Sequence, residues 1–307
     1  MSDQNPPVDV PASDEALHPP GPEPLWSESY YLDFVDAERG VGGYVRVALL
    51  PNLGRAWYWA CVVGPDRPLV TVIDQDVPLP RTGLELRTEG LWADYNVETP
   101  LDHVSVGVEA FGVALDDPAD TYGHLRGERV PLGLDLEWES EHAPYRYPGT
   151  DRYEVPCRVH GEVLVGREEI QVDGFGQRDH SWAARDWWGM SWSWHSGRLD
   201  DGTRFHGTRV EIDGTPLYGT GYLIEPRGPL VPTGTVARSE QLGPHGFPTT
   251  ASWQVADLEM TLEPVAFSPV LLAADDGRVA RFPRAWCRVT TADGRTGHSW
   301  TEWNQPG

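Results

Sequence analysis

Strict alternation of apolar and polar residues runs through most of the chain. In His103–Phe111, valine or alanine occupies every second position, with serine, glycine or glutamate between them. Leu132–Glu139 alternates leucine and tryptophan with glycine and acidic residues in the same way. A period of two is typical of strands that bury one face, and no helical period is sustained anywhere. Further predicted strands are Tyr44–Leu50, Trp57–Val63, Leu69–Ile73, Leu84–Glu98, Tyr153–His160, Glu162–Glu169, Thr203–Ile212, Leu217–Glu225, Ser252–Leu262, Val279–Thr290 and Thr296–Trp303.

Tight turns connect these strands in sequence order. Asp-Asp-Gly at 200–202 and at 275–277 is a typical hairpin turn. Antiparallel strands joined in this way favour up-and-down barrels or curled sheets, and one closed barrel needs about eight strands. The pattern therefore predicts an all-β protein with two antiparallel barrels in tandem, residues 25–172 and 173–307. Residues 1–24 are rich in proline and acidic residues, and we expect them to form a disordered leader.

The segment 174–195 has the highest density of charged and aromatic residues in the chain. We expect a charged loop from Arg178 to Asp186, which leads into a strand with alternating residues. On this strand Trp192 and Trp194 share one face, which we expect to line the barrel interior, and His195 lies on the other face. Such residues can form a polar anchor in a hydrophobic pocket, or an acid–base group in a dry site. They can equally form a structural network, and the spacing alone favours neither interpretation. In that network Arg178 and Arg185 would neutralise Asp179 and Asp186, and the tryptophans would fill the core.

Composition narrows the class of protein. The formal net charge of −23 and the pI of about 4.7 argue against nucleic acid or an anionic membrane as partner. The chain contains no lysine, which excludes a lysine Schiff base, a pyridoxal enzyme and a Walker-type phosphate loop. Cys61, Cys157 and Cys287 have no metal-binding spacing and fit a reducing compartment. Neither a signal peptide nor a run of membrane-spanning length is present, so we predict a cytoplasmic protein, of unknown oligomeric state.

Two histidines are candidates for a metal pair. His195 and His206 lie on predicted strands joined by the turn at Asp201-Gly202, and could be cross-strand neighbours. With a carboxylate they could bind a metal ion. The compact histidine spacing that makes a metal motif informative is missing, so the sequence predicts no metal and no other cofactor.

The run Arg178-Asp179-His180-Ser181-Trp182, followed by Arg185-Asp186-Trp187, resembles the Asp-His-x-Trp signature of the carotenoid 1,2-hydratase (hydroxyneurosporene synthase) and AttH-like superfamily. The decalin-forming fungal Diels–Alderases share its architecture. The resemblance implies two lipocalin-like barrels with a hydrophobic ligand pocket. It also implies that His180 and Trp182 match residues tied to activity in the hydratases. Weaker similarity is found in the segments 26–31, 219–222 and 299–302.

The chain departs from the signature in two places. Ala183 stands where the signature commonly has glycine. The Tyr-x-Asp pair that the hydratases use downstream has no counterpart, since Thr203–Glu211 offers His206, Arg209 and Glu211 instead. The fold therefore carries over better than the reaction, because a shared fold is not a shared activity.

If the reaction is the addition of water to an alkene, the residues of the central segment could have the following roles. A carboxylic acid can donate the proton if burial raises its pKa, tryptophan faces can stabilise the cation, and a neutral imidazole can deprotonate the water. A nearby arginine would keep the carboxylate ionised, so if both aspartates are paired with arginine, neither is the acid. The predicted catalytic residues are Asp179, His180 and Asp186. The predicted substrate-binding residues are Trp182, Trp187, Trp192, Trp194, His195 and His206, and the predicted structural network is Arg178 and Arg185.

The sequence thus favours a cofactor-independent hydratase, dehydratase or cyclase. We expect its substrate to be a hydrophobic, isoprenoid-like or polyketide-like small molecule. The alternative is a non-catalytic carrier for such a ligand. Polar groups that converge on one pocket would favour the enzyme, whereas a purely apolar pocket with every Arg and Asp paired would favour the carrier.

Overall fold

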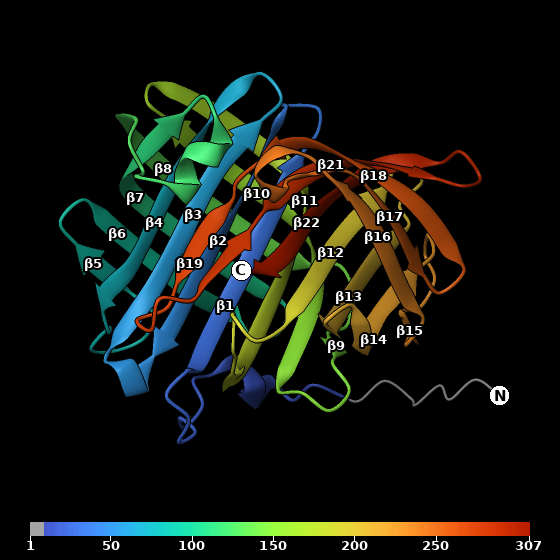
Figure 1. Ribbon diagram of the computed structural model, residues 1–307, viewed down its shortest axis with the longest axis horizontal. Coiled ribbons are helices and arrows are strands. Elements are labelled where there is room, and N and C mark those ends of the chain that lie inside the picture. The colour runs from blue at the N-terminus through green and yellow to red at the C-terminus, as the bar shows by residue number, and fades with distance from the viewer. Residues whose placement is uncertain (1–8) are drawn as a thin grey trace. The chain divides into compact units, whose positions relative to one another are not determined.

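The computed structural model describes residues 9–307, which form two compact units (Figure 1). The N-terminal unit comprises residues 9–117 and 126–185, and the C-terminal unit comprises residues 118–125 and 186–307. The division falls after Arg185 rather than at Asp173, because one strand, β11 (Glu168–Ala184), runs through the expected boundary. This strand pairs with β10 along its first part and with both β10 and β1 further on. A boundary at Asp173 would cut it in the middle.

The N-terminal unit is a closed barrel. Its strands are hydrogen-bonded in the order β4-β3-β2-β1-β11-β10-β8-β7, and β4 also pairs with β7, which closes the ring. The pair β6 and β5 extends from β7, and β9 pairs with β10. The strands are β1 (Trp26–Asp36), β2 (Val41–Leu50), β3 (Arg55–Gly64), β4 (Arg67–Pro78), β5 (Leu86–Thr88), β6 (Leu91–Thr99), β7 (His103–Leu115), β8 (Glu128–Ser140), β9 (Tyr145–Arg146), β10 (Arg152–Val165) and β11.

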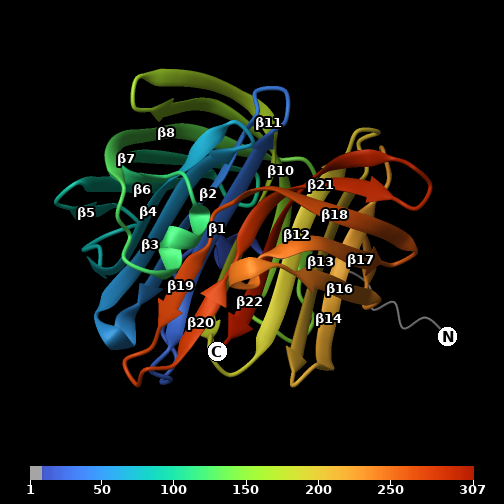
Figure 2. The same cartoon turned by 45° about the horizontal axis from the view of Figure 1, so that its top comes forward.

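The C-terminal unit is a curled antiparallel sheet (Figure 2). Its order is β15-β14-β13-β12-β22-β21-β18-β17-β16, and the hairpin β19–β20 joins it through β22. Arg209 of β13, the third strand from one end of the sheet, donates to the carbonyl oxygen of Val236 in β16, the strand at the other end. The strands are β12 (Ser191–Leu199), β13 (Arg204–Ile212), β14 (Thr215–Ile224), β15 (Val231–Thr233), β16 (Val236–Leu242), β17 (Pro248–Val255), β18 (Leu258–Phe267), β19 (Val270–Ala273), β20 (Val279–Phe282), β21 (Arg284–Thr291) and β22 (Thr296–Pro306).

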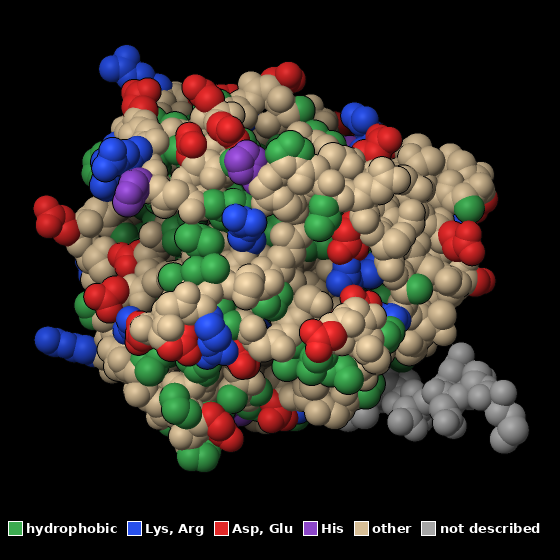
Figure 3. All heavy atoms as spheres, in the orientation of Figure 1, with side chains coloured by type: hydrophobic (Ala, Val, Ile, Leu, Met, Phe, Trp, Pro, Cys, Tyr) green, Lys and Arg blue, Asp and Glu red, His purple; other side chains and the backbone are tan. Residues whose placement is uncertain are grey.

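The fold is all-β, as the alternating pattern predicts. The only helices among residues 9–307 are short 3-10 turns: η1 (Ala12–Glu15), η2 (Pro51–Leu53), η3 (Pro118–Tyr122) and η4 (Pro244–Gly246). None of these is of a length and apolarity that could cross a membrane. Acidic side chains are spread over the face drawn in Figure 3, with arginines between them, in keeping with the negative net charge.

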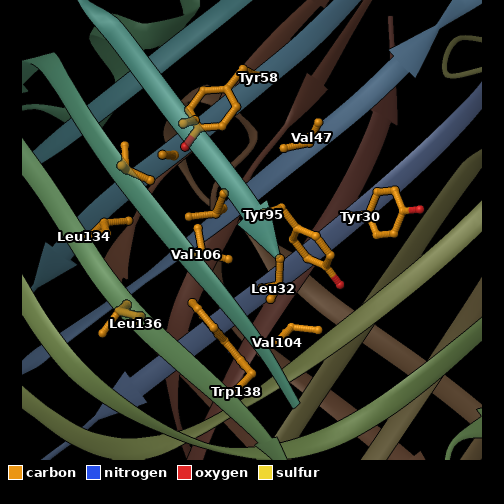
Figure 4. Close-up of a cluster of buried hydrophobic side chains, with 14 of the residues drawn as sticks. Tyr30, Leu32, Val47, Tyr58, Tyr95, Val104, Val106, Leu134, Leu136 and Trp138 are labelled. Atoms are coloured by element: carbon orange, nitrogen blue, oxygen red, sulfur yellow. The ribbon is translucent and has the colours of Figure 1, made fainter. Parts of the chain in front are cut away.

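Alternate residues of each strand supply the core of the N-terminal barrel. On β1, the side chains of Tyr30 and Leu32 belong to the same buried cluster as Val106 of β7 and Trp138 of β8 (Figure 4). All of these residues are at most 2 % exposed. The interior is therefore an apolar core into which individual polar groups on the same strand faces project.

The segment before β1 departs from the expected disordered leader. Residues 1–8 lie outside the described residues. From Asp9 onward the chain packs on the N-terminal barrel: Val10 joins the hydrophobic core, and the carboxylate of Glu15 is buried. The composition suggested disorder because little apolar surface is present, but charged contacts described below hold the segment.

Gly176 of β11 allows the closest backbone approach in the N-terminal barrel. A Cβ atom at this position would lie 1.9 Å from the carbonyl oxygen of Asp33 in β1, and neither backbone can yield without breaking sheet pairing. We expect Gly176→Ala to lower the free energy of unfolding by about 1–3 kcal/mol or more. Urea unfolding measures the change. Gly234→Ala, where the added methyl group meets nothing within 4 Å, is the control, and equal stability of the two variants would contradict the expectation.

Candidate functional site

The N-terminal barrel holds a histidine–glutamate–histidine cluster, in which Glu28 and His180 are buried and His18 is half-buried. His180 of β11 and Glu28 of β1 are near neighbours on adjacent strands, and their side chains share the inward face. Nε2 of His180 lies 2.6 Å from Oε1 of Glu28, and Nδ1 of His18 lies 2.9 Å from the same oxygen. The backbone N–H of His18 donates to the other carboxylate oxygen at 3.0 Å. One carboxylate thus holds two imidazole rings.

Aromatic rings enclose this cluster. The ring of Tyr30 stacks on His180 at 4.0 Å between centroids, and the ring of His18 stacks on Trp182 at 3.9 Å. The guanidinium group of Arg146 lies over the ring of Trp182, 4.9 Å from the ring centroid. Burial, and then the negative charge of Glu28, raises the pKa of Tyr30 far above its ordinary value. The phenol therefore stays protonated, as a hydrogen-bond donor.

The second ring nitrogen of His180, Nδ1, is the atom of this cluster that could transfer a proton. Nδ1 of His180 is buried and has no hydrogen-bond partner among residues 9–307. With its Nε2 proton donated to Glu28, a neutral ring carries a lone pair on Nδ1, which is the state of a general base. With both nitrogens protonated, the carboxylate stabilises the imidazolium and Nδ1 becomes an acid. The same atom can therefore accept and return a proton.

His18, Glu28 and His180 are also the residues that could hold a metal ion. Their ligand atoms lie within 4.8 Å of one another. Two imidazoles and a carboxylate are a suitable donor set for a divalent transition metal. However, the separations of 2.6 and 2.9 Å between nitrogen and oxygen are hydrogen-bond distances, and the free Nδ1 of His180 lacks the acceptor that usually orients a ligating histidine. The geometry fits proton sharing better than metal ligation.

A second buried ion pair adjoins the cluster. Nη1 of Arg178 lies 2.8 Å from Oε1 of Glu15, and both side chains are 2 % exposed. Glu15 also accepts hydrogen bonds from the hydroxyl of Tyr95 and from the backbone N–H of Leu101. The leader segment thus supplies Glu15 as well as His18. The structural network that was left open as an alternative paired Arg178 with an aspartate of the same run, but its inward side chain pairs with Glu15 of the leader instead.

Neither predicted aspartate lies beside His180. Asp179 points to the opposite face of β11, where Arg152 contacts it at 2.8 Å. Asp186 is a turn residue 47 % exposed at its side chain, 3.5 Å from Arg278. The charged run is a strand as far as Ala184, so successive side chains alternate between faces. Arg185 donates to the hydroxyl of Ser181 rather than to an aspartate.

The predicted binding residues 187–206 belong to the C-terminal unit. Trp187 and Trp192 pack with Phe282, and Trp194 packs on His206. The expectation that Trp194 lines the interior of the C-terminal barrel is wrong. The core of that unit lies on the other face of β12, the one that carries His195.

The suggested metal pair is not formed. His195 is paired with Gly207, and His206 with Ser196, so the two imidazoles point to opposite faces of the sheet. Nδ1 of His206 is bonded to the backbone oxygen of His195, 2.9 Å away. The strands are neighbours as expected, but the register separates the side chains.

The residues that the sequence reading missed are Glu28, His18 and Glu15. A signal was present for Glu28, which alternates with Trp26 and Tyr30 and so places a carboxylate on an apolar strand face. Such a carboxylate needs a buried partner. His18 and Glu15 carried no local signal, because nothing in a proline-rich acidic segment indicates insertion into a barrel.

The surface pockets of the two units are lined by residues other than those of the His180 cluster. One of about 600 Å³ lies over β16, β17, β18 and β21 of the C-terminal unit and is lined by polar side chains such as Ser239, Thr261 and Thr290. It contains none of the predicted site residues. The buried cluster around His180 is therefore the stronger candidate, since its groups are desolvated and convergent.

His195 should make stability depend on pH. Burial, and then repulsion from His206, lowers its pKa well below the ordinary value of about 6.5, so the folded protein keeps it neutral. Below that pH the imidazole of His195 binds a proton in the unfolded chain but not in the folded protein. We expect the free energy of unfolding to fall by up to about 1.4 kcal/mol per pH unit as the pH drops below 6.5. Urea unfolding of the wild type and of His195→Leu, from pH 7.5 to 5, isolates this loss, and identical pH profiles would contradict it.

Solved structures share this fold over nearly the whole chain. A putative AttH from Nitrosomonas europaea has a TM-score of 0.67 at 14% identity, with 99% of each chain covered. Kievitone hydratase from Nectria haematococca has a TM-score of 0.62 at 9% identity, with 97% of this chain and 93% of that chain covered. CghA with Sch210972 has a TM-score of 0.60 at 11% identity, with 92% and 89% covered.

These similarities confirm the AttH-like, tandem-barrel fold that the sequence resemblance implied. At such low identities they show the fold alone. No curated protein sequence matches the chain. A family profile described as "Domain of unknown function (DUF7064)" matches residues 11–307, and the chain therefore belongs to that family.

Proposed function

We propose that the protein is a hydratase, dehydratase or cyclase that acts by acid–base chemistry at His180. The observation that carries the proposal is the buried imidazole whose Nε2 is held by Glu28 and whose Nδ1 has no partner within the described part of the chain. A group that is desolvated, oriented and left with one open nitrogen is poised for proton transfer.

The proposed step moves one proton through Nδ1. In the dehydration direction, neutral His180 removes a proton from a substrate carbon, and Glu28 stabilises the imidazolium that results. The same proton then goes to the hydroxyl on the adjacent carbon, which leaves as water and gives a carbon–carbon double bond. Hydration is the reverse of this sequence. The ring of Trp182, whose centroid lies 4.9 Å from that of His180, would help to stabilise the positive charge of the imidazolium.

The surroundings favour a hydrophobic substrate. The barrel walls beyond the cluster are aliphatic and aromatic, including Val47, Val106 and Leu134 (Figure 4). The hydroxyl of Tyr58 projects among them without a hydrogen-bond partner among residues 9–307, and could orient a single oxygen of the substrate. This supports the isoprenoid-like or polyketide-like class, which combines a large apolar body with few oxygens.

Access to His180 would require movement of the leader. His180 is fully buried, and His18 lies against Trp182 beside it. Asp14, on the same segment, pairs with Arg146 at 2.6 Å. We propose that the segment 9–24 is displaced when substrate enters and re-forms these contacts over it. Substrate would then react out of contact with water.

The alternative is a carrier for the same class of ligand. It is favoured by the pairing of Asp179 with Arg152 and of Asp186 with Arg278, which removes both aspartates as acids. The open nitrogen of His180 favours the enzyme, because a carrier has no need for it. The hydratase among the similar structures is in keeping with an enzyme but does not carry the argument.

Oxygen exchange tests the proposal. The full-length protein is incubated in H₂¹⁸O with a panel of hydrophobic β-hydroxy ketones and the corresponding enones, and mass spectrometry follows ¹⁸O incorporation and double-bond formation. We expect wild-type protein, but not His180→Gln, to accelerate exchange for at least one member. Tight binding of panel members by both proteins, with no exchange, would overturn the enzyme in favour of the carrier.

A further inference from the structure

The core of the C-terminal unit contains a second group of buried polar side chains. Ser193 and His195 lie on the inward face of β12, and Trp303 of β22 is directly paired with Ser193. The ring of Trp253 in β17 stacks on His195 with 3.9 Å between centroids and 24° between planes. Each of these four residues is at most 2 % exposed. They come from three strands and converge on the core side of one sheet.

Within the part of the chain that the structure describes, none of these side chains has a hydrogen-bond partner. Both ring nitrogens of His195, the hydroxyl of Ser193 and the indole N–H groups of Trp253 and Trp303 are unpaired within residues 9–307. Buried polar groups in native proteins are almost always hydrogen-bonded, so several unpaired groups in one place require an explanation. Gly207, paired with His195, adds to this arrangement, since a Cβ atom there would lie only 2.9 Å from Nε2. Glycine at this position therefore lets the imidazole of His195 lie close to the backbone of β13.

The charged groups on the same strand faces are already neutralised. Arg209 and Arg238 both contact Glu211, at 3.2 and 3.0 Å, and Arg238 also contacts Glu240. An anion or a cation would have to break these pairs. Within residues 9–307, the uncharged groups without a partner on these faces are two indole donors, one hydroxyl and one neutral imidazole, and the surrounding core is apolar and aromatic. Such a set matches oxygen acceptors on a flat, uncharged body.

We propose that the core of the C-terminal unit binds a small, uncharged aromatic compound that carries carbonyl or hydroxyl oxygens. Its oxygens accept hydrogen bonds from Trp253, Trp303 and Ser193, and its ring lies against the aromatic walls. His195 offers both a donor and an acceptor and so accepts either a carbonyl or a hydroxyl group. This site is independent of the chemistry at His180, which belongs to the N-terminal unit.

Nuclear magnetic resonance of the indole N–H groups tests the site on the intact protein. The signals of Trp253 and Trp303 are assigned from Trp253→Phe and Trp303→Phe, and 4-hydroxyacetophenone is the probe. We expect saturable shifts of both signals. Toluene, which lacks oxygen, and 4-hydroxybenzoate, which is charged, should leave them in place. Equal shifts with toluene, or water contacts at both indoles without any response to the probe, would overturn the proposal.

Calorimetry of variants separates the two sites. We expect Ser193→Ala and His195→Leu to weaken binding of 4-hydroxyacetophenone at least tenfold, and His180→Gln to leave it unchanged. If His180→Gln abolishes binding while Ser193→Ala and His195→Leu do not, the compound binds in the N-terminal barrel and the second site is wrong. The indole shifts of the wild type decide the matter even if a variant does not fold.

Discussion

Replacing Glu15 with alanine should lower the free energy of unfolding by about 3–5 kcal/mol, because it strands the buried charge of Arg178. Glu15 is the ionic partner at 2.8 Å, and both groups are removed from water. Two further hydrogen bonds, from Tyr95 and from the backbone of Leu101, are lost with it. Urea unfolding of Glu15→Ala against the wild type measures the effect.

Two variants establish the cause. Asp14→Ala breaks the neighbouring pair with Arg146, whose members are 18 % and 19 % exposed, and should cost no more than about 1 kcal/mol. The double variant Glu15→Leu/Arg178→Met removes both charges and should recover much of the loss, since two apolar groups of similar volume tolerate burial. A Glu15→Ala protein as stable as the wild type would show that the segment is dispensable, as its composition suggests.

Replacing His180 with glutamine should abolish acid–base turnover while the protein remains folded. The amide N–H₂ can still donate to Glu28, so the buried carboxylate keeps a partner, but glutamine cannot accept and return a proton. A positioned general acid–base group contributes about 10²–10⁴-fold to rate, and we expect a loss of that size. The measurement is the rate of ¹⁸O exchange on the substrate found with the wild type, together with thermal unfolding of both proteins.

Glu28→Gln and Asp186→Asn complete this test. The first removes the charge that stabilises the His180 imidazolium, and should slow exchange and shift its pH profile with little change in fold. The second alters an exposed turn residue of the C-terminal unit that pairs with Arg278, and should leave rate and stability as they are. Full activity of His180→Gln, or its loss in Asp186→Asn, would show that the chemistry lies elsewhere.

Much of the fold follows from local pattern. Alternation in segments such as His103–Phe111 and Leu132–Glu139 predicts strands that the structure contains as β7 and β8. The Asp-Asp-Gly turn at 200–202 joins β12 and β13 as expected. These features depend on the alternation of side chains and on the turn residues within a few positions, so they can be predicted directly from the sequence.

The structure of the central motif required more than composition. Its charge density suggested a loop from Arg178 to Asp186, yet β11 continues to Ala184, because β1 and β10 satisfy its backbone hydrogen bonds on both sides. Once the segment is a strand, neighbouring residues must face opposite ways. That geometry separates Asp179 from His180 and joins Arg178 and His180 on the inward face.

By itself, the sequence determined the all-β class, the tandem barrels and the place of His180 in the motif most dense in charge. Only the tertiary structure decided which groups surround it. Glu28 is 152 residues from His180 along the chain, and Glu15 is 163 residues from Arg178. Strand propensity depends on a few neighbouring residues, but the pairing of strands in a barrel brings together side chains that are distant in the sequence. The partner of a buried charge is therefore set by which strand faces meet, and no local pattern records that choice.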